Sequence, residues 1–302
     1  MQSQLNKTAL KAQSLADPSD TLFQVMKLAE HCLSTSSSDS PRNEIEWLMM
    51  DLFSCSRSDL HLNRNHRMEE RKLGILSSWV ERRATGEPLQ YITQRTEFFG
   101  LPIQLNRQVM IPRPETEKLV EVAINHARRI RAATIVDVGT GSGCIAIAIA
   151  KELPEVHLLA LDCNEDALEL AGRNALSNGV ADRIVFERSD ILTQDIPNSC
   201  DLLVSNPPYI PIDEMDGLPE DIREFEPTDA LTDGHDGLEF YRRLCAMARR
   251  WVVSGGFMVL ETGRGEHPEK VRHLFANAGF ITTATHQDYN GDDRVISIQV
   301  TE

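Results

Sequence analysis

The 302-residue chain lacks the features that mark several common classes of protein. No segment approaches the roughly 18 consecutive apolar residues that span a bilayer, so we expect no membrane span. The lysines near its N-terminus precede no apolar stretch, so we expect no secretory signal. Its six cysteines form no C-x-x-C pair, which argues against a disulfide framework and a zinc site. We therefore expect reduced thiols, no metal and a cytoplasmic location.

The chain is also short of basic residues, with a net charge of −15. Residues 1–110 hold 13 basic and 13 acidic residues, whereas residues 111–302 hold 18 basic and 33 acidic ones. Tight binding to a phosphate backbone usually needs a basic face. We therefore expect no direct nucleic-acid substrate, and a basic protein surface is the more natural partner.

The pattern of apolar residues divides the chain into four parts. Residues 1–20 are polar, and we expect a flexible N-terminal extension there. Residues 21–88 carry apolar residues at helical spacing, which predicts a small helical domain ending near Gly86 and Pro88. Residues 89–111 read as a β-hairpin connector, with strands expected at 98–103 and 108–111.

The fourth part, residues 112–302, alternates between strand and helix patterns. An Arg-Pro-Glu-Thr-Glu run at 113–117 opens a helix, with proline and acidic residues in its first turn. The tail at 281–300 reads as two strands around a tight turn. This alternation predicts an α/β fold with a doubly wound sheet. Its expected strands are 134–138, 157–161, 184–187, 202–205 and 257–261, with helices at about 142–152 and 164–178.

A glycine-rich loop follows the first expected strand of this part. Glycines at 139, 141 and 143 allow a tight turn and close approach of the backbone to a ligand. A dinucleotide fingerprint would require glycine at 144, where Cys144 stands. The Asp-x-Gly-x-Gly-x-Gly spacing instead resembles the first motif of Rossmann-like methyltransferases. That resemblance implies S-adenosylmethionine as the cofactor, held by Asp137, Gly139, Thr140, Gly141, Ser142 and Gly143.

Acidic residues also end the next two strands. Asp162 stands where such sheets bind ribose hydroxyls. Asp190, followed by Ile191, stands where these enzymes hold adenine, and its carboxylate can accept the exocyclic amine. The alternative is that Asp162 and Asp190 merely cap the turns that follow them. Three acids at three successive strand ends favour the cofactor site.

The fourth strand leads directly into Asn206-Pro207-Pro208-Tyr209. The prolines remove two backbone donors and stiffen the loop, which leaves carbonyls as acceptors. A planar amide or aromatic amino nitrogen is a poor nucleophile because its lone pair is delocalised. The Asn206 oxygen and the Pro207 carbonyl could accept its two N–H bonds and orient it, with Tyr209 packed against the planar group. The alternative is a turn that only ends a strand.

This four-residue motif leaves several acceptors open, because it occurs in enzymes acting on DNA or RNA amino groups and on glutamine side chains. The chain as a whole resembles the HemK/PrmC family of glutamine methyltransferases. The residues that carry the resemblance are 40–42, 86–92, 98–100, 111–117, the glycine loop, 206–209, 225–227, 236–238, 241–243, Asp292 and Arg294.

The resemblance implies methylation of the glutamine in the Gly-Gly-Gln motif of class 1 peptide chain release factors, which tunes translation termination. It also implies a class I methyltransferase sheet and a helical N-terminal domain that docks the release factor. Asn206, Pro207, Pro208 and Tyr209 would take the glutamine, Asn206 would also adjoin the cofactor, and Asn206, Pro207 and Tyr209 would be catalytic. A ribosomal-protein glutamine and a nucleic-acid amino group remain as alternatives. The run at 113–117 favours the release-factor branch, since the ribosomal-protein branch typically lacks it.

Overall fold

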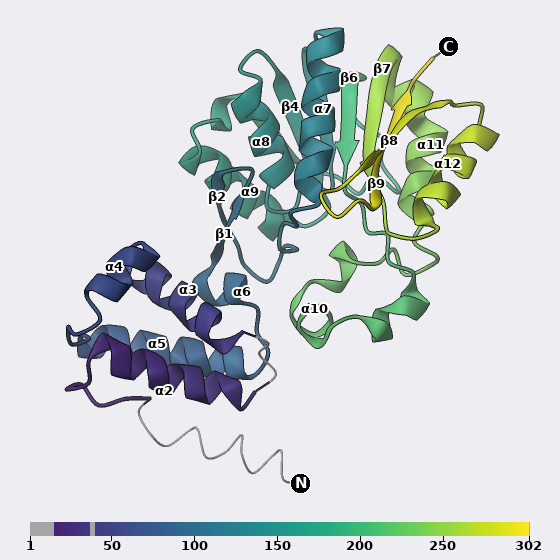
Figure 1. Cartoon of the computed structure of the whole chain (residues 1–302). Coiled ribbons are helices and arrows are strands. Elements are labelled where there is room, and N and C mark those ends of the chain that lie inside the picture. Colours follow the sequence, from purple (N-terminus) through teal and green to yellow (C-terminus); the bar gives the residue numbers. More distant parts are fainter. Residues whose placement is uncertain (1–14, 37–39, 302) are drawn as a thin grey trace. The chain divides into compact units, whose positions relative to one another are not determined.

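A computed structural model describes residues 15–36 and 40–301 and divides the chain into two compact units, with the boundary between Gln94 and Arg95. Residues 1–14 of the expected extension lie outside the described residues. Each unit has its own buried core. Figure 1 traces both units along the sequence.

The first unit is helical. Thr21 caps its first described helix in a capping box with Gln24, so side chains satisfy backbone groups that the helix itself leaves unpaired. Val25, Leu48 and Leu76, from three of its helices, are fully buried in a common core. Its helices are α2 (Leu22–Ser34), α3 (Pro41–Phe53), α4 (Arg57–Leu62), α5 (Glu70–Ala84) and α6 (Leu89–Thr93).

The second unit opens with a β-hairpin. Strands β1 (Arg95–Phe98) and β2 (Leu101–Gln104) pair antiparallel around Phe99 and Gly100. Both turn residues have positive φ, as a tight two-residue hairpin requires. The strand expected at 108–111 is wrong, because that segment has no regular secondary structure and part of it lines a pocket instead of pairing.

The sheet of the second unit has seven strands in the order β5-β4-β3-β6-β7-β9-β8. The first five are parallel, and the last two add antiparallel pairs at the β7 edge. The predicted doubly wound α/β fold is confirmed. The strands are β3 (Thr134–Val138), β4 (His157–Asp162), β5 (Ile184–Arg188), β6 (Cys200–Ser205), β7 (Val252–Glu261), β8 (Thr282–Gln287) and β9 (Asp293–Gln299).

Helices cover both faces of this sheet (Figure 1). One face packs on α11 and α12, whose Tyr241, Trp251 and Phe275 are buried with Val136 and Val138 of β3. Because side chains alternate along a strand, Ile135 and Asp137 point to the other face. The helices are α7 (Thr116–Ile130), α8 (Cys144–Glu152), α9 (Glu165–Ser177), α10 (Glu220–Phe225), α11 (Glu239–Trp251) and α12 (His267–Asn277), with short 3-10 helices η2 (Ala181–Arg183), η3 (Ile212–Gly217) and η4 (Thr228–Ala230).

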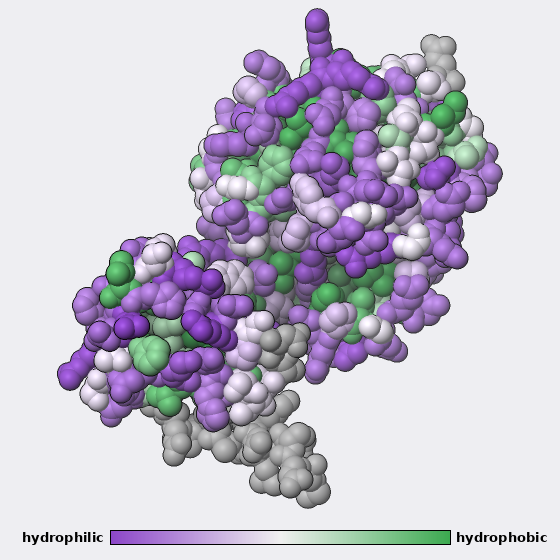
Figure 2. Space-filling model, in the orientation of Figure 1, coloured by the Kyte–Doolittle hydropathy of each residue, from purple (hydrophilic) through white to green (hydrophobic). Residues whose placement is uncertain are grey.

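The chain order places a natural binding site between β3 and β6. After β3 the chain proceeds to β4 and β5 on one side, and after β6 it proceeds to β7 on the other. The loops that leave the carboxyl ends of these adjacent strands therefore diverge and open a crevice. On the face seen in Figure 2, hydrophilic residues cover most of the second unit, and hydrophobic ones gather between the α10 segment and the body of the unit.

Candidate active site

A pocket of the second unit lies at the carboxyl ends of β3, β4 and β6. It brings together most of the residues that the sequence singled out. Its lining includes Gly139, Thr140, Gly141, Ser142, Asp162, Asp190, Ile191, Asn206, Pro207 and Pro208. Gly143, Asp137 and Tyr209 are the predicted residues that do not line it.

The glycine loop connects β3 to α8 along one wall of the pocket. Gly139, Gly141 and Gly143 have φ values of 73°, 53° and 80°, a region that side chains with a Cβ rarely adopt. A Cβ on Gly139 or Gly141 would meet no atom within 4 Å, so the backbone there is open to a ligand. A Cβ on Gly143 would lie 3.0 Å from the Cβ of Ala171, because Gly143 packs against α9. Gly143 therefore shapes the loop from behind.

Asp162 links the end of β4 to this loop. Its Oδ2 accepts a hydrogen bond from the Gly141 amide at 2.8 Å, and its Oδ1 accepts one from the Asn164 amide at 3.0 Å. Burial raises the pKa of this carboxyl group, and the backbone hydrogen bonds oppose that shift. The group therefore holds the glycine loop while its remaining lone pairs can accept ligand hydroxyls.

Asp190 and Ile191 form the wall beyond β5. The Asp190 Oδ1 accepts a hydrogen bond from the Leu192 amide at 3.0 Å, so this residue does cap the turn that follows it. Ile191 is buried, and its carbonyl accepts from the Arg243 Nε at 2.8 Å. Arg243 thereby fixes an apolar side chain beside an exposed carboxylate, a combination that suits a flat ring with an amino group.

The opposite wall is the turn that follows β6. The Ser205 hydroxyl donates to the Val138 carbonyl at 2.7 Å and ties β6 to β3 just before the pocket. Asn206 comes next, and its Nδ2 donates to the Thr116 Oγ1 at 3.2 Å. A Cβ on Gly237 would lie 2.3 Å from the Tyr209 carbonyl oxygen, so only glycine allows the 237 backbone to pack this closely on the turn.

Asp137 and Tyr209 lie outside the pocket lining. Asp137 is fully buried and accepts a hydrogen bond from the Thr140 hydroxyl at 2.7 Å. Burial raises its pKa to about 7. The Tyr209 hydroxyl accepts from the Arg294 Nη2 at 3.0 Å, and its ring packs beside His267 with centroids 5.8 Å apart. The stacking of Tyr209 on the acceptor stays a prediction.

Sequence reasoning missed the segment that closes the pocket from the hairpin side. Gln108, Val109, Met110 and Pro112 all line it, as do Thr116, Asp229, Ala230 and Phe240. The Ile111–Glu117 run carries part of the family resemblance, but nothing in its composition indicates contact with a nucleotide.

Glu226 anchors this segment. Its carboxylate accepts from the Ile111 amide at 3.2 Å and pairs with Arg113. Burial raises the pKa of Glu226, and Arg113 opposes the shift. The ion pair thus fastens the 111–113 segment to the loop between α10 and η4.

The arrangement fits a nucleoside with an attached charged chain. It offers a glycine loop whose backbone is open to a ligand, two carboxylates and an apolar wall. Among residues 15–36 and 40–301, no group of three or more His, Cys, Asp or Glu side chains is placed to hold a metal ion. No helix in that same part of the chain is long and apolar enough to cross a membrane.

Both units of the chain match known protein families. Residues 24–93 match a family model described as PrmC N-terminal domain, and residues 116–216 match the methyltransferase small domain. A release factor glutamine methyltransferase of Geobacter sulfurreducens is 37% identical, with 91% of this chain and 95% of that protein aligned. One of the same name from Nitratidesulfovibrio vulgaris is 41% identical over 80% of this chain and 82% of its own.

Solved structures resemble the chain in fold. A methyltransferase from Pyrococcus furiosus aligns with a TM-score of 0.50 at 16% identity, covering 68% of this chain and 91% of its own. The hMettl16 catalytic domain aligns with a TM-score of 0.54 at 15% identity, covering 78% and 83%. At these identities the likeness concerns the Rossmann-like fold alone.

Proposed function

The chain belongs to the release factor glutamine methyltransferase family, and from that premise we propose that it methylates the glutamine of the Gly-Gly-Gln motif in class 1 peptide chain release factors. The methyl group comes from S-adenosylmethionine and goes to the side-chain amide nitrogen. The reaction modifies the loop that the release factor uses in termination, so it tunes translation termination.

One observation carries this proposal. The glycine loop after β3 and the Asn206–Pro208 turn after β6 line the same pocket, on strands that are direct neighbours in the sheet. Methyl transfer needs a donor and an acceptor nitrogen in one water-excluding site. A cofactor-binding scaffold would have no use for a second wall built from Asn206 and two prolines.

The residues of the glycine-loop side suit S-adenosylmethionine. Asp162 would accept the ribose hydroxyls, Asp190 and Ile191 would face the adenine, and the loop from Gly139 to Ser142 would lie along the methionine portion. When bound, this cofactor supplies an electrophilic sulfonium methyl group. We include no metal in the reaction, because methyl transfer from a sulfonium requires no Lewis acid.

The residues of the acceptor side orient the nucleophile. The Asn206 Oδ1 and the Pro207 carbonyl accept the two N–H bonds of the glutamine amide, which raises the electron density on nitrogen and fixes the direction of its lone pair. The nitrogen loses one proton after transfer, when methylation has made it acidic. No general base is therefore required, and positioning supplies much of the rate enhancement.

Recognition of the whole release factor extends beyond this pocket. We assign docking to the helical unit at 21–88, whose PrmC N-terminal match at 24–93 supports that role. The acidic excess of residues 111–302 favours a basic surface around the Gly-Gly-Gln loop, which works against ribosomal RNA. Release factors act in the cytoplasm, so we place the enzyme there.

The test incubates labelled S-adenosylmethionine with purified release factor, with a variant whose motif glutamine is alanine, with ribosomal protein and with nucleic acid. We expect label on the unmodified release factor and none on the alanine variant. Label on nucleic acid, on ribosomal protein or on the alanine variant would overturn the assignment.

A further inference from the structure

The turn after β6 packs against a second loop, which runs from η4 to α11. Backbone hydrogen bonds join the two, including one of 3.0 Å from the Ile210 amide to the Leu231 carbonyl. Gly237, near the end of this loop, packs so closely on the Tyr209 carbonyl that a Cβ would clash with it. The position of Gly237 therefore affects the turn on which Asn206 lies.

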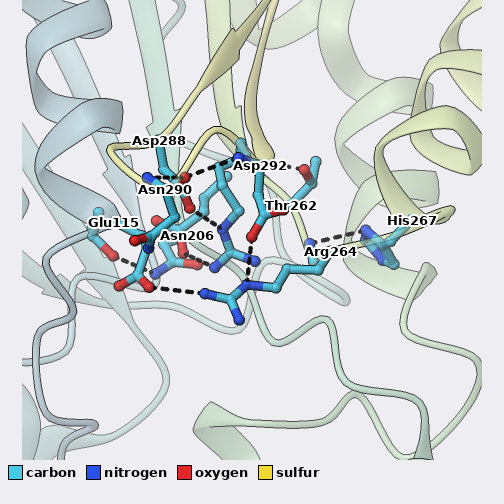
Figure 3. A network of polar contacts seen from close by, with 12 residues as sticks. Glu115, Asn206, Thr262, Arg264, His267, Asp288, Asn290 and Asp292 are labelled. Carbon is cyan, nitrogen blue, oxygen red and sulfur yellow. Dashed lines mark hydrogen bonds and ion pairs between the residues drawn. The ribbon is translucent and has the colours of Figure 1, made fainter.

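His267, the first residue of α12, contacts this glycine. The side chain is only 9% exposed, and its Nε2 lies 3.2 Å from the Gly237 carbonyl oxygen. Its Nδ1 accepts a hydrogen bond from the Gly263 amide at 3.1 Å. Figure 3 shows this second contact as a dashed line from His267 to the loop that carries Thr262 and Arg264. One imidazole ring thus joins the loop that leaves β7 to the loop that enters α11.

These two contacts determine where the proton of the ring lies. The Gly263 amide can only donate, so the Nδ1 of His267 accepts and carries no proton. A neutral imidazole has a single N–H, which is then on Nε2, where it donates to the Gly237 carbonyl. Burial lowers the pKa of His267, and the hydrogen bond to Gly237 opposes that shift. The ring is therefore neutral near pH 7.

Aromatic neighbours restrict the rotation of this ring. The centroid of the His267 ring lies 5.8 Å from that of Tyr209 and 5.3 Å from that of Tyr241, which meets it edge-on. The Tyr241 hydroxyl is itself held, because it donates to the Glu261 carbonyl at 2.6 Å. A Cβ on Gly263 would lie 3.2 Å from the His267 Cγ, so the backbone also packs on the ring. These contacts keep the Nε2 proton directed at the Gly237 carbonyl.

We propose that His267 is a positioning residue for the acceptor side of the pocket. It lies outside the pocket lining, so it acts through its neighbours. Its Nε2–H holds the Gly237 carbonyl, Gly237 packs on Tyr209, and the turn keeps the direction in which Asn206 presents the substrate nitrogen. The inference rests on the proposed function, since it concerns the side of the site that receives the glutamine amide.

The test compares two substitutions that each keep one of the two hydrogen bonds. The side chain introduced by His267→Gln reaches as far as the imidazole Nε2 and can donate to Gly237, whereas that of His267→Asn reaches only as far as Nδ1 and can accept from Gly263. We expect His267→Asn to lower kcat for release factor at least about 5-fold, as for a buried carbonyl left without its donor. His267→Gln should stay within about 3-fold of wild type, because that donor remains.

Cofactor binding separates positioning from a general loss of structure. The Kd for S-adenosylmethionine should stay within about 2-fold in both variants, because the glycine loop, Asp162 and Asp190 follow other strands. His273→Asn is the matched control, since this histidine is exposed on the same helix. Equal losses of kcat in His267→Gln and His267→Asn would overturn the inference, and so would a parallel loss of cofactor affinity.

NMR of the histidine ring nitrogens tests the tautomer in the wild-type enzyme, even if a variant fails to fold. For His267 we expect a proton on Nε2 and none on Nδ1 at about pH 7.5. A proton on Nδ1 would overturn the inference whatever the rates. If wild-type enzyme leaves the release factor unmethylated, the proposed function fails, whereas the wrong tautomer in an active enzyme refutes only the role of His267.

Discussion

A substitution of Asn206 can distinguish the acceptor side of the pocket from the cofactor side. Asn206→Ala removes the proposed acceptor of the glutamine N–H and leaves the glycine loop, Asp162 and Asp190 in place. We expect transfer to release factor to fall by at least about 100-fold, as for loss of a preorganised catalytic hydrogen bond. Cofactor affinity, measured by calorimetry, should change little. An equal loss of both would show that Asn206 serves the cofactor.

Glu261 provides a residue-scale prediction about pH. Burial raises its pKa from 4.5 to about 7, against the opposing effects of Arg294, Thr116 and Arg113 and in the same direction as Glu115. Between pH 4.5 and about pH 7 the Glu261 carboxyl group is protonated in the folded protein and ionised in the unfolded chain. The contribution of Glu261 to the free energy of unfolding is therefore full below pH 4.5 and is lost as pH rises through 7.

Glu261→Gln, which cannot titrate, isolates this effect. The stability of wild type relative to Glu261→Gln should fall on the order of 3 kcal/mol from pH 4.5 to pH 7.5, measured by urea unfolding. The exposed Glu155→Gln is the control for loss of a carboxylate. A difference between wild type and Glu261→Gln that does not change with pH would contradict the buried position of an ionisable Glu261.

At the scale of elements, one buried side chain joins the hairpin, the glycine loop and α9. The Asn174 Oδ1 accepts from the Gln104 amide at 2.8 Å, and its Nδ2 donates to the carbonyls of Gln104 and Ser142 at 3.0 and 2.9 Å. Asn174 is fully buried, so its loss leaves three backbone groups without a partner.

Asn174→Ala should therefore destabilise the protein by about 2–4 kcal/mol in urea unfolding and weaken cofactor binding. The exposed Asn198→Ala, in the turn before β6, should change stability by less than about 0.5 kcal/mol. Similar stabilities for the two variants would mean that the Asn174 hydrogen bonds do not hold these elements together.

The strands also show which elements the sequence pattern predicts correctly and which it does not. Strands such as β3 and β4 were predicted to within a residue, because a buried parallel strand is an apolar run bounded by turn residues. The hairpin was expected but displaced, with its second strand placed at 108–111 instead of Leu101–Gln104. Apolar Val109 and Ile111 resemble a strand, yet they are buried beside a pocket and have no partner strand.

At the scale of the whole molecule, charge predicts how the enzyme meets its partner. The acidic excess of residues 111–302 should attract a basic release factor, and salt screens such attraction. We expect kcat/KM for full-length release factor to fall about 5- to 10-fold between 50 and 300 mM NaCl. The Kd for S-adenosylmethionine serves as the control and should change less than about 2-fold. A rate that is constant or rises with salt would exclude electrostatic attraction.

The sequence by itself determined the chemistry of this protein. It depends on short runs of adjacent residues. The glycines of the loop after β3 adopt the positive φ values that this turn requires, and the two prolines after Asn206 lack backbone N–H donors. The order of strands and helices also followed from local patterns.

Only the tertiary structure decided which distant residues support these motifs. The Tyr209 hydroxyl accepts a hydrogen bond from Arg294, which lies 85 residues further along the chain. Asn206 follows β6 and Thr116 begins α7, so their hydrogen bond depends on how these two elements meet. A hydrogen bond acts over about 3 Å whatever the separation along the chain, so such partners become visible only when the sheet is assembled.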